Sequence, residues 1–346
     1  MRLHTPLKSH LWQLLFSAAA CLSATSCTDL VYDGEGDCRV RYLVRFKYDY
    51  NMKFADAFRP EVDEVTLHLI DGEGNVVWNK TETGAQLKED GYAMTVDVEP
   101  GTYSMVAWCS SEAPQTFDAG FDGSREGLHA RFHTVTAEDN SLHISNQLDR
   151  LFHGYVADAE FPDATEGDFT YTIPLTKDTN HFVVTLQQLS GEPIDSELVE
   201  FEITDDNTHL CWDNVPAAGN ETTYHQWFKR TVSADLSAGS RSSEELNNRF
   251  GGVVAELTTS RLMENSPARL KVYRTDTGET IASIRLIDAL LLVMGYENER
   301  SLTTQQYLDY KDEYNLIFFL DSDHRWIDNS IQIEAWSVVY NEVKVD

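Results

Sequence analysis

The side chains that could do chemistry are thinly spread along these 346 residues. The chain contains none of the common catalytic signatures GxSxG, HExxH, GxGxxG, Walker A or CxxC. His129 and His133 are four residues apart, but the segment LHARFH reads as loop entering strand. In extended backbone that spacing does not bring two metal ligands together. We therefore expect no catalytic residue, no cofactor and no metal site.

Carboxylates give two further weak patterns. Residues 71–82 place oxygen-bearing side chains at several positions of a calcium-binding loop, but Val76 stands where the sharp turn requires glycine. A plain hairpin turn is the better interpretation. Neighbouring acids such as Asp205–Asp206 could suggest a glycosidase pair. With 57 acidic residues in the chain, such neighbours arise by chance, and we interpret them as solvated surface.

The charge balance excludes two classes of partner. The chain has 57 Asp and Glu against 27 Lys and Arg, a formal net charge of −30. Residues 1–26 contribute only Arg2 and Lys8, so without them the balance is 25 − 57 = −32. Binding to nucleic acid requires a field of basic side chains, and so does docking to an anionic lipid surface. We therefore expect no nucleic-acid partner.

The amino terminus is typical of a targeting segment. Leu11–Leu22 is an apolar run of 12 residues, which is too short to span a bilayer as a helix. The small residues Ala24-Thr25-Ser26 then precede Cys27, as in a bacterial lipoprotein processing box. We predict that residues 1–26 are a signal peptide and that Cys27 is lipidated. Cys21 is a weaker rival site, and an ordinary signal peptide with an incidental cysteine is the alternative.

Lipidation would make membrane attachment effectively permanent. One acyl chain is a marginal anchor, but a lipoprotein carries two or three, and each buried CH₂ contributes about 0.8 kcal/mol. Residues 27–37 are acidic and contain glycine, so we interpret them as a tether between the acyl chains and a folded body.

Three cysteines remain in that body: Cys38, Cys109 and Cys211. Their spacing matches no zinc site. Export to an oxidising compartment allows one disulfide among them, which would leave one thiol free. Buried free thiols, acting as small apolar side chains, are an equally good interpretation.

The elements that must position these residues are mostly strands. Residues 38–48 alternate strictly, with an apolar face and a basic face that includes Arg41, Arg45 and Lys47. The basic face either pairs with carboxylates of neighbouring strands or forms a contact patch. Short alternating runs separated by turn residues continue to the carboxyl terminus, which is typical of β-sandwiches.

We predict two β-domains in series, covering 38–160 and 168–346. The junction is placed in the acidic stretch 156–167, which lacks periodicity. Two segments of the second domain, Leu286–Met294 and Thr303–Tyr310, are expected to form short helices.

The last segment, Ile331–Val345, raises a separate question. It begins with half-buried strand alternation, and from Trp336 onward both faces are apolar. Such a segment is either buried within the chain or contributed to the sheet of a neighbouring subunit. The sequence favours burial within the chain and leaves the second possibility open.

Several short pieces, in order along nearly the whole body, resemble the FimB-type fimbrial anchor family, the lipoprotein subunits at the base of fimbrillin fimbriae. After the lipoprotein Cys27 they are Cys38–Tyr48 with the following Asp49-Tyr50-Asn51, Ala55-Asp56-Ala57-Phe58, Val65–Asp71, Tyr92–Val96, Pro100–Trp108, Leu151–Gly154, Leu175–Asn180, Ser260–Met263, Gln306–Asp309, Asp312–Tyr314, Trp326 and Ile331–Val339. Tyr310 departs from the pattern, because a basic residue is expected there.

The resemblance implies two transthyretin-like β-sandwich domains and an outer membrane lipoprotein at the cell surface. It further implies a role in fixing the fimbrial shaft of fimbrillin subunits and limiting its length, without catalysis. A surface lipoprotein that binds glycans is the alternative function. A lipid-anchored hydrolase is disfavoured by the missing motifs.

Overall fold

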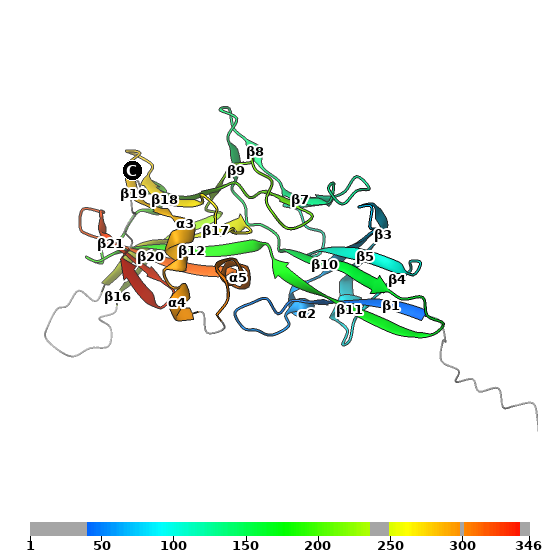
Figure 1. Cartoon of the computed structure of the whole chain (residues 1–346). Coiled ribbons are helices and arrows are strands. Elements are labelled where there is room, and N and C mark those ends of the chain that lie inside the picture. Colours follow the sequence, from blue (N-terminus) through cyan, green and yellow to red (C-terminus); the bar gives the residue numbers. More distant parts are fainter. Residues whose placement is uncertain (1–39, 236–248, 298–300, 340–346) are drawn as a thin grey trace, which may run out of the picture. The chain divides into compact units, whose positions relative to one another are not determined.

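The computed structural model describes residues 40–235, 249–297 and 301–339 (Figure 1). The predicted signal peptide, the tether, Cys27 and Cys38 lie outside these residues, as does the segment after Val339. Among the described residues, 41–163 and 168–339 form one compact unit. Strands dominate that unit, which confirms the predicted all-β class.

The first sheet contains seven strands in the order β3-β2-β5-β10-β11-β1-β4. Their bounds are β1 Val40–Lys47, β2 Glu64–Ile70, β3 Val76–Thr83, β4 Met94–Val96, β5 Gly101–Ser110, β10 Leu151–Phe161 and β11 Gly167–Lys177. The alternation of β1 is confirmed, because Tyr42, Val44 and Phe46 are buried while the basic side chains face out.

The basic face of β1 meets carboxylates at two of its positions. Arg41 makes a bidentate pair with Asp168, with both N···O distances at 2.7 Å. Lys47 pairs with Asp49 at 2.6 Å. Both pairs are well exposed, so each contributes little to stability.

The second sheet has six strands in the order β16-β17-β12-β20-β21-β22. Their bounds are β12 Thr179–Gln188, β16 Phe228–Asp235, β17 Arg249–Ser260, β20 Glu313–Leu320, β21 Trp326–Ile333 and β22 Trp336–Val339. β12 pairs antiparallel with β17 and parallel with β20.

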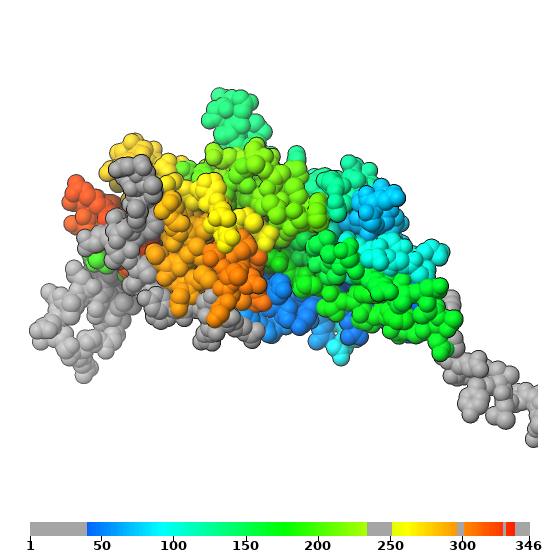
Figure 2. Space-filling model, viewed as in Figure 1, coloured from blue at the N-terminus to red at the C-terminus, as the bar shows by residue number. Residues whose placement is uncertain are grey.

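The third sheet has the order β19-β18-β13-β15-β9-β8, and a fourth, smaller sheet has the order β14-β7-β6. Their bounds are β6 Phe117–Gly120, β7 His129–Phe132, β8 Val135–Thr136, β9 Leu142–Ile144, β13 Val199–Asp205, β14 His209–Cys211, β15 Thr222–His225, β18 Arg269–Arg274 and β19 Thr280–Arg285. The β8–β9 hairpin stands out from the surface (Figure 2), and its Val135 is exposed.

The helices are few and short. In the described residues they are α2 Phe58–Glu61, α3 Leu286–Leu291, α4 Met294–Glu297 and α5 Thr304–Tyr310, with two 3-10 turns at Gly84–Lys88 and Ser196–Leu198. The two predicted helical segments are therefore confirmed. Thr303 caps α5 by accepting from the Gln306 backbone N–H, while the Gln306 side chain accepts from the Thr303 backbone N–H. No described helix is long and apolar enough to cross a membrane.

The sheets exchange strands across the predicted boundary between residues 160 and 168. β11 belongs to the first sheet, whereas β9 pairs in parallel with β15 in the third. The acidic stretch 156–167 is strand at both ends. Its missing periodicity has a local cause: a register shift between Val156 and Ala159, where Asp158 has a φ of 48°. The division into two transthyretin-like domains stays a prediction.

Gly154 shows how closely β10 and β11 approach one another. A Cβ atom at this position would lie 2.4 Å from Ile173 Cγ2 and 2.9 Å from the Pro174 carbonyl oxygen. Only glycine allows this backbone contact. Packing against β11 therefore requires glycine at the last position of the Leu151–Gly154 segment.

The predicted final strand is two strands. β21 ends at Ile333, Glu334 turns the chain with a φ of 53°, and β22 pairs back onto β21. Ile331 and Ile333 are fully buried. Residues 331–339 thus complete a sheet of this chain, as the sequence favoured, and β22 is the outermost strand of that sheet in the described residues.

Candidate functional site

A groove of about 1010 Å³ opens on the surface of the described residues. Three parts of the chain form it: the segment after β1, the start of β20 with the residues before it, and single residues from other elements. The lining residues that carry charge are Lys53, Asp56, Glu61, Arg150, Lys177, Lys311, Asp312, Glu313 and Glu334.

The segment after β1 is a tightly bonded loop. Asn51 is buried, and its amide donates to the carbonyl oxygens of Tyr48 at 3.0 Å and Ala55 at 2.8 Å. One Asp56 carboxylate oxygen accepts from the backbone N–H groups of Tyr48 and Phe58, each at 3.0 Å. These bonds satisfy backbone groups that no strand partner reaches.

Ion pairs join this loop to the residues that follow α5. Lys177 Nζ lies 3.2 Å from Glu61 Oε2 and 2.5 Å from Asp312 Oδ2, and its side chain is only 13% exposed. On the other side of the groove Glu334 accepts from Asn315, at 2.9 Å from its backbone N–H and 3.0 Å from its side-chain amide. Lys177, Glu61 and Asp312 thus contribute paired charges to the groove wall.

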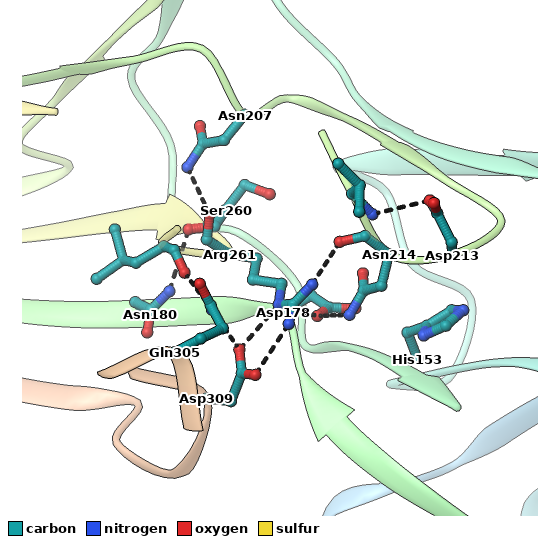
Figure 3. Close-up of polar contacts among 12 residues, drawn as sticks. His153, Asp178, Asn180, Asn207, Asp213, Asn214, Ser260, Arg261, Gln305 and Asp309 are labelled. Carbon is teal, nitrogen blue, oxygen red and sulfur yellow. Dashed lines mark hydrogen bonds and ion pairs between the residues drawn. The ribbon is translucent and has the colours of Figure 1, made fainter. Parts of the chain in front are cut away.

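Behind this wall lies a buried cluster, which we call the Arg261 node: Arg261, Asp309, Asp178 and Asn214 (Figure 3). The Arg261 guanidinium donates two bonds to the Asp309 carboxylate, both at 2.9 Å. It also donates to the Asn214 carbonyl oxygen at 2.5 Å, and its Nε lies 3.9 Å from Asp178 Oδ1. Only the planar guanidinium of arginine, with several N–H donors in fixed directions, can bond to these acceptors at the same time.

Amide side chains fix the backbone around the node. Asn207 donates to the Arg261 carbonyl oxygen at 2.9 Å, and Asn180 donates to that of Ser260 at 3.0 Å. Gln305 of α5 donates to both the Leu262 carbonyl oxygen and Asp309 Oδ1. Four separate segments of the chain are thus tied at one point.

His153 lies beside the node on β10. Its ring packs against Trp108 in a tilted arrangement, with the ring centroids 4.6 Å apart, and its Nε2 bonds to the Trp212 carbonyl oxygen at 2.9 Å. Since that carbonyl can only accept, Nε2 carries the proton. Burial lowers the pKa of His153 to about 3, and nearby Arg261 adds to this lowering. The ring is therefore neutral in the folded protein.

Replacing His153 with glutamine should make the free energy of unfolding fall less steeply as the pH is lowered. Below about pH 6.5 the unfolded chain takes up a proton at this histidine that the folded chain refuses until about pH 3. Its contribution to the free energy of unfolding therefore falls by up to about 1.4 kcal/mol per pH unit over that window. Urea unfolding between pH 4 and pH 7 measures the slope, and glutamine keeps a donor for the Trp212 carbonyl.

The matched control is His133→Gln, at a half-exposed ring that bonds to Asp118. This variant should keep the wild-type slope. If the free energy of unfolding of the two glutamine variants had the same slope against pH, His153 would not be the source of that pH dependence.

Six of the short pieces that carry the family resemblance meet at this groove and node. Residues 48–51, 55–58 and 312–314 lie at the groove, while 175–180, 260–263 and 306–309 supply or flank the node. Sequence reasoning identified the pieces but not their meeting point, because strand pairing between distant residues brings them together. Tyr310, the departure from the pattern, packs against Tyr50 at 4.9 Å and Phe54 at 5.4 Å. An aromatic contact thus occupies the place of a basic residue.

The other sequence candidates serve local structure. The interpretation of Asp205–Asp206 as solvated surface is wrong for Asp205, which is 2% exposed and accepts from the Ser266 hydroxyl and the Asp206 backbone N–H. Asp71 accepts from the backbone N–H groups of Glu73 and Asn75, so its carboxylate closes the predicted hairpin turn. His129 and His133 bond to different partners, the Gly127 carbonyl oxygen and Asp118. Cys109 and Cys211 are both free thiols. In the part of the chain that the structure describes, no three His, Cys, Asp or Glu side chains gather as metal ligands.

Comparison with known proteins identifies the family. A family model for the fimbrillin-A associated anchor proteins Mfa1 and Mfa2 matches residues 35–342. This chain belongs to that family. The resemblance inferred from the short pieces is therefore confirmed, and membership places the chain among the fimbrillin-associated anchor proteins. Among curated proteins, the comparison found no match.

Solved structures share the architecture of this family member. A candidate adhesin of Bacteroides thetaiotaomicron is 32% identical, with a TM-score of 0.73 over 87% of this chain and 97% of that one. A candidate polysaccharide-binding protein of the same organism is 27% identical, with a TM-score of 0.72 over 88% and 99%. The fimbrial anchor protein Mfa2 of Porphyromonas gingivalis is 16% identical, with a TM-score of 0.61 over 88% and 100%, which shows a shared fold.

Proposed function

We propose that this protein is an outer membrane lipoprotein that anchors the fimbrial shaft to the cell and limits its length, without catalysis. The observation that carries the proposal is the extent of the family match, which begins at residue 35, close behind Cys27, and runs through the folded body. A fibre base must hold a membrane on one side and a protein subunit on the other. Acyl chains on Cys27 would supply the first attachment.

The folded body suits the second attachment. A subunit at the base of a fibre transmits tension between its two attachments, so its segments must be tied together by side chains as well as by backbone. The Lys177 ion pairs join β11 to α2 and to the residue before β20. The Arg261 node joins the end of β17 to α5. The groove presents charged side chains of both signs, which suits polar contacts with a fimbrillin subunit.

Replacing Cys27 with alanine should abolish lipidation and release fimbriae into the medium. The variant has no sulfur to acylate, so it should remain unprocessed or become soluble. Metabolic labelling with a fatty acid, together with fractionation of membranes and medium, measures both effects. Cys21→Ala is the matched control and should leave labelling and fimbriae unchanged. Label that persists in the Cys27→Ala protein would reject this lipidation site.

Glycan binding is the second candidate, because one relative is described as a candidate polysaccharide-binding protein. Sugar sites usually offer exposed aromatic faces, and Phe121 and Phe228 are the exposed large aromatic side chains among the described residues. Glycan-array binding by the purified protein would favour this function. Co-purification of the protein with fimbriae, and no array signal, would favour the anchor.

A further inference from the structure

Asp178 occupies the point where the chain passes between two sheets. It is the single residue between β11, in the first sheet, and β12, in the second. Its backbone N–H donates to the Leu151 carbonyl oxygen at 2.8 Å, and its side chain is fully buried in the Arg261 node. The protonation state of this carboxyl group therefore affects the one-residue connection between β11 and β12.

The hydrogen bonds at Asp178 leave two acceptor atoms without donors. The Asn214 amide donates from Nδ2 to Asp178 Oδ1 at 2.8 Å. The other oxygens of the same two groups, Asp178 Oδ2 and Asn214 Oδ1, are both buried and have no hydrogen-bond partner. Two acceptors cannot satisfy each other, and buried polar atoms without partners are costly. One proton placed between Asp178 Oδ2 and Asn214 Oδ1 gives each of these oxygens a hydrogen-bond partner.

We propose that Asp178 carries a proton on Oδ2 in the folded protein and donates it to Asn214 Oδ1. The carboxylic acid and the amide then form a closed pair with two hydrogen bonds, one in each direction. This acid–amide pair locks the connection between β11 and β12. Asn214 is suited to its place, because its φ of 64° lies in the left-handed region that asparagine tolerates.

The charges that face Asp178 agree with a neutral acid. Arg261 is the nearest cation, but its guanidinium makes both of its short carboxylate bonds with Asp309. A second carboxylate would leave the buried node with an excess negative charge. Asp309 itself opposes ionisation of Asp178. The Cys109 thiol and the Tyr48 phenol also interact electrostatically with Asp178. Burial raises the pKa of each group, so both stay neutral.

The direction of the titration follows from this environment. Burial raises the pKa of Asp178 to about 7, while Arg261 and Asn214 oppose the rise. The unfolded chain loses this proton near pH 4. Between about pH 4 and pH 7 the folded chain thus holds a proton that the unfolded chain lacks, so this group favours folding less as pH rises. Above about pH 7 the carboxylate forms, Asn214 loses its donor and the lock weakens.

The test compares two Asp→Asn variants of the full chain by urea unfolding at pH 5 and pH 7.5. Asp178→Asn places an amide where the proposal has a protonated acid, so both hydrogen bonds persist at every pH. Relative to wild type, its folding constant should rise by on the order of a hundredfold between the two pH values. Asp309→Asn removes the carboxylate that holds Arg261, so it should be less stable than wild type at both pH values.

Carbon-13 NMR of the Asp178 carboxyl carbon in the wild-type chain gives a reading that does not depend on the variants folding. The proposal expects the carbon to report a protonated acid at pH 5 and to titrate above pH 6. A carboxylate signal at pH 5 would overturn it. So would an Asp178→Asn variant whose stability follows that of wild type in parallel across the pH range.

Discussion

Replacing Arg261 with methionine should lower the free energy of unfolding by about 3–5 kcal/mol, because it removes one partner of a buried ion pair. The Arg261 side chain is 12% exposed and that of Asp309 is 13% exposed. Methionine fills similar volume but leaves the Asp309 carboxylate and the Asn214 carbonyl oxygen without these donors. Urea unfolding monitored by tryptophan fluorescence measures the change.

A lysine at position 261 tests whether geometry or charge supplies the stability. It keeps the positive charge but cannot make the parallel bonds to Asp309 and a third bond to Asn214. We therefore expect Arg261→Lys to lose most of the stability that Arg261→Met loses.

The control is a second bidentate pair, Arg274 with Asp276, which lies at the surface with N···O distances of 2.9 and 2.6 Å. Its side chains are 27% and 41% exposed, so water screens the pair. Arg274→Met should cost less than about 1 kcal/mol. If both variants lost the same free energy of unfolding, burial would not increase the contribution of the Arg261 node to stability.

Deleting residues 331–346 should remove most of the stability of the chain. Ile331 and Ile333 are fully buried, and loss of each large aliphatic side chain costs about 2–5 kcal/mol. The deletion also removes the β21 residues that pair with Leu316, Ile317 and Phe318 of β20, and it exposes the buried face of Phe318. Native proteins have about 5–15 kcal/mol in total, so we expect loss of the cooperative thermal transition in circular dichroism.

A shorter deletion, of residues 340–346, separates folding from attachment. It leaves β21 and β22 intact, so the protein should keep its melting transition. If this variant stays folded but no longer carries fimbriae, the terminal residues are contributed to a neighbouring subunit. If the longer deletion left the protein folded and normally fimbriated, both interpretations of Ile331–Val345 would be wrong.

The sequence alone determined the features that rest on local pattern. Strict alternation in residues 40–47 depends only on the two-residue period of a strand, and the turn at Asp71–Asn75 depends on its own residue types. Thr303 and Gln306 mark the start of α5 by a contact within one helical turn. The missing catalytic motifs and the acidic balance likewise required no tertiary structure. The resemblance to the family rested on the ordered short pieces alone.

Only the tertiary structure decided which of these residues act together. β11 and β12 are adjacent in sequence yet join different sheets, and β9 pairs with a strand that lies far along the chain. Such pairings depend on packing between distant segments, which no local period encodes. The Arg261 node has the same origin: Asp178, Asn214, Arg261 and Asp309 are isolated polar residues in the sequence. Burial makes them a unit, because charges removed from water must find one another.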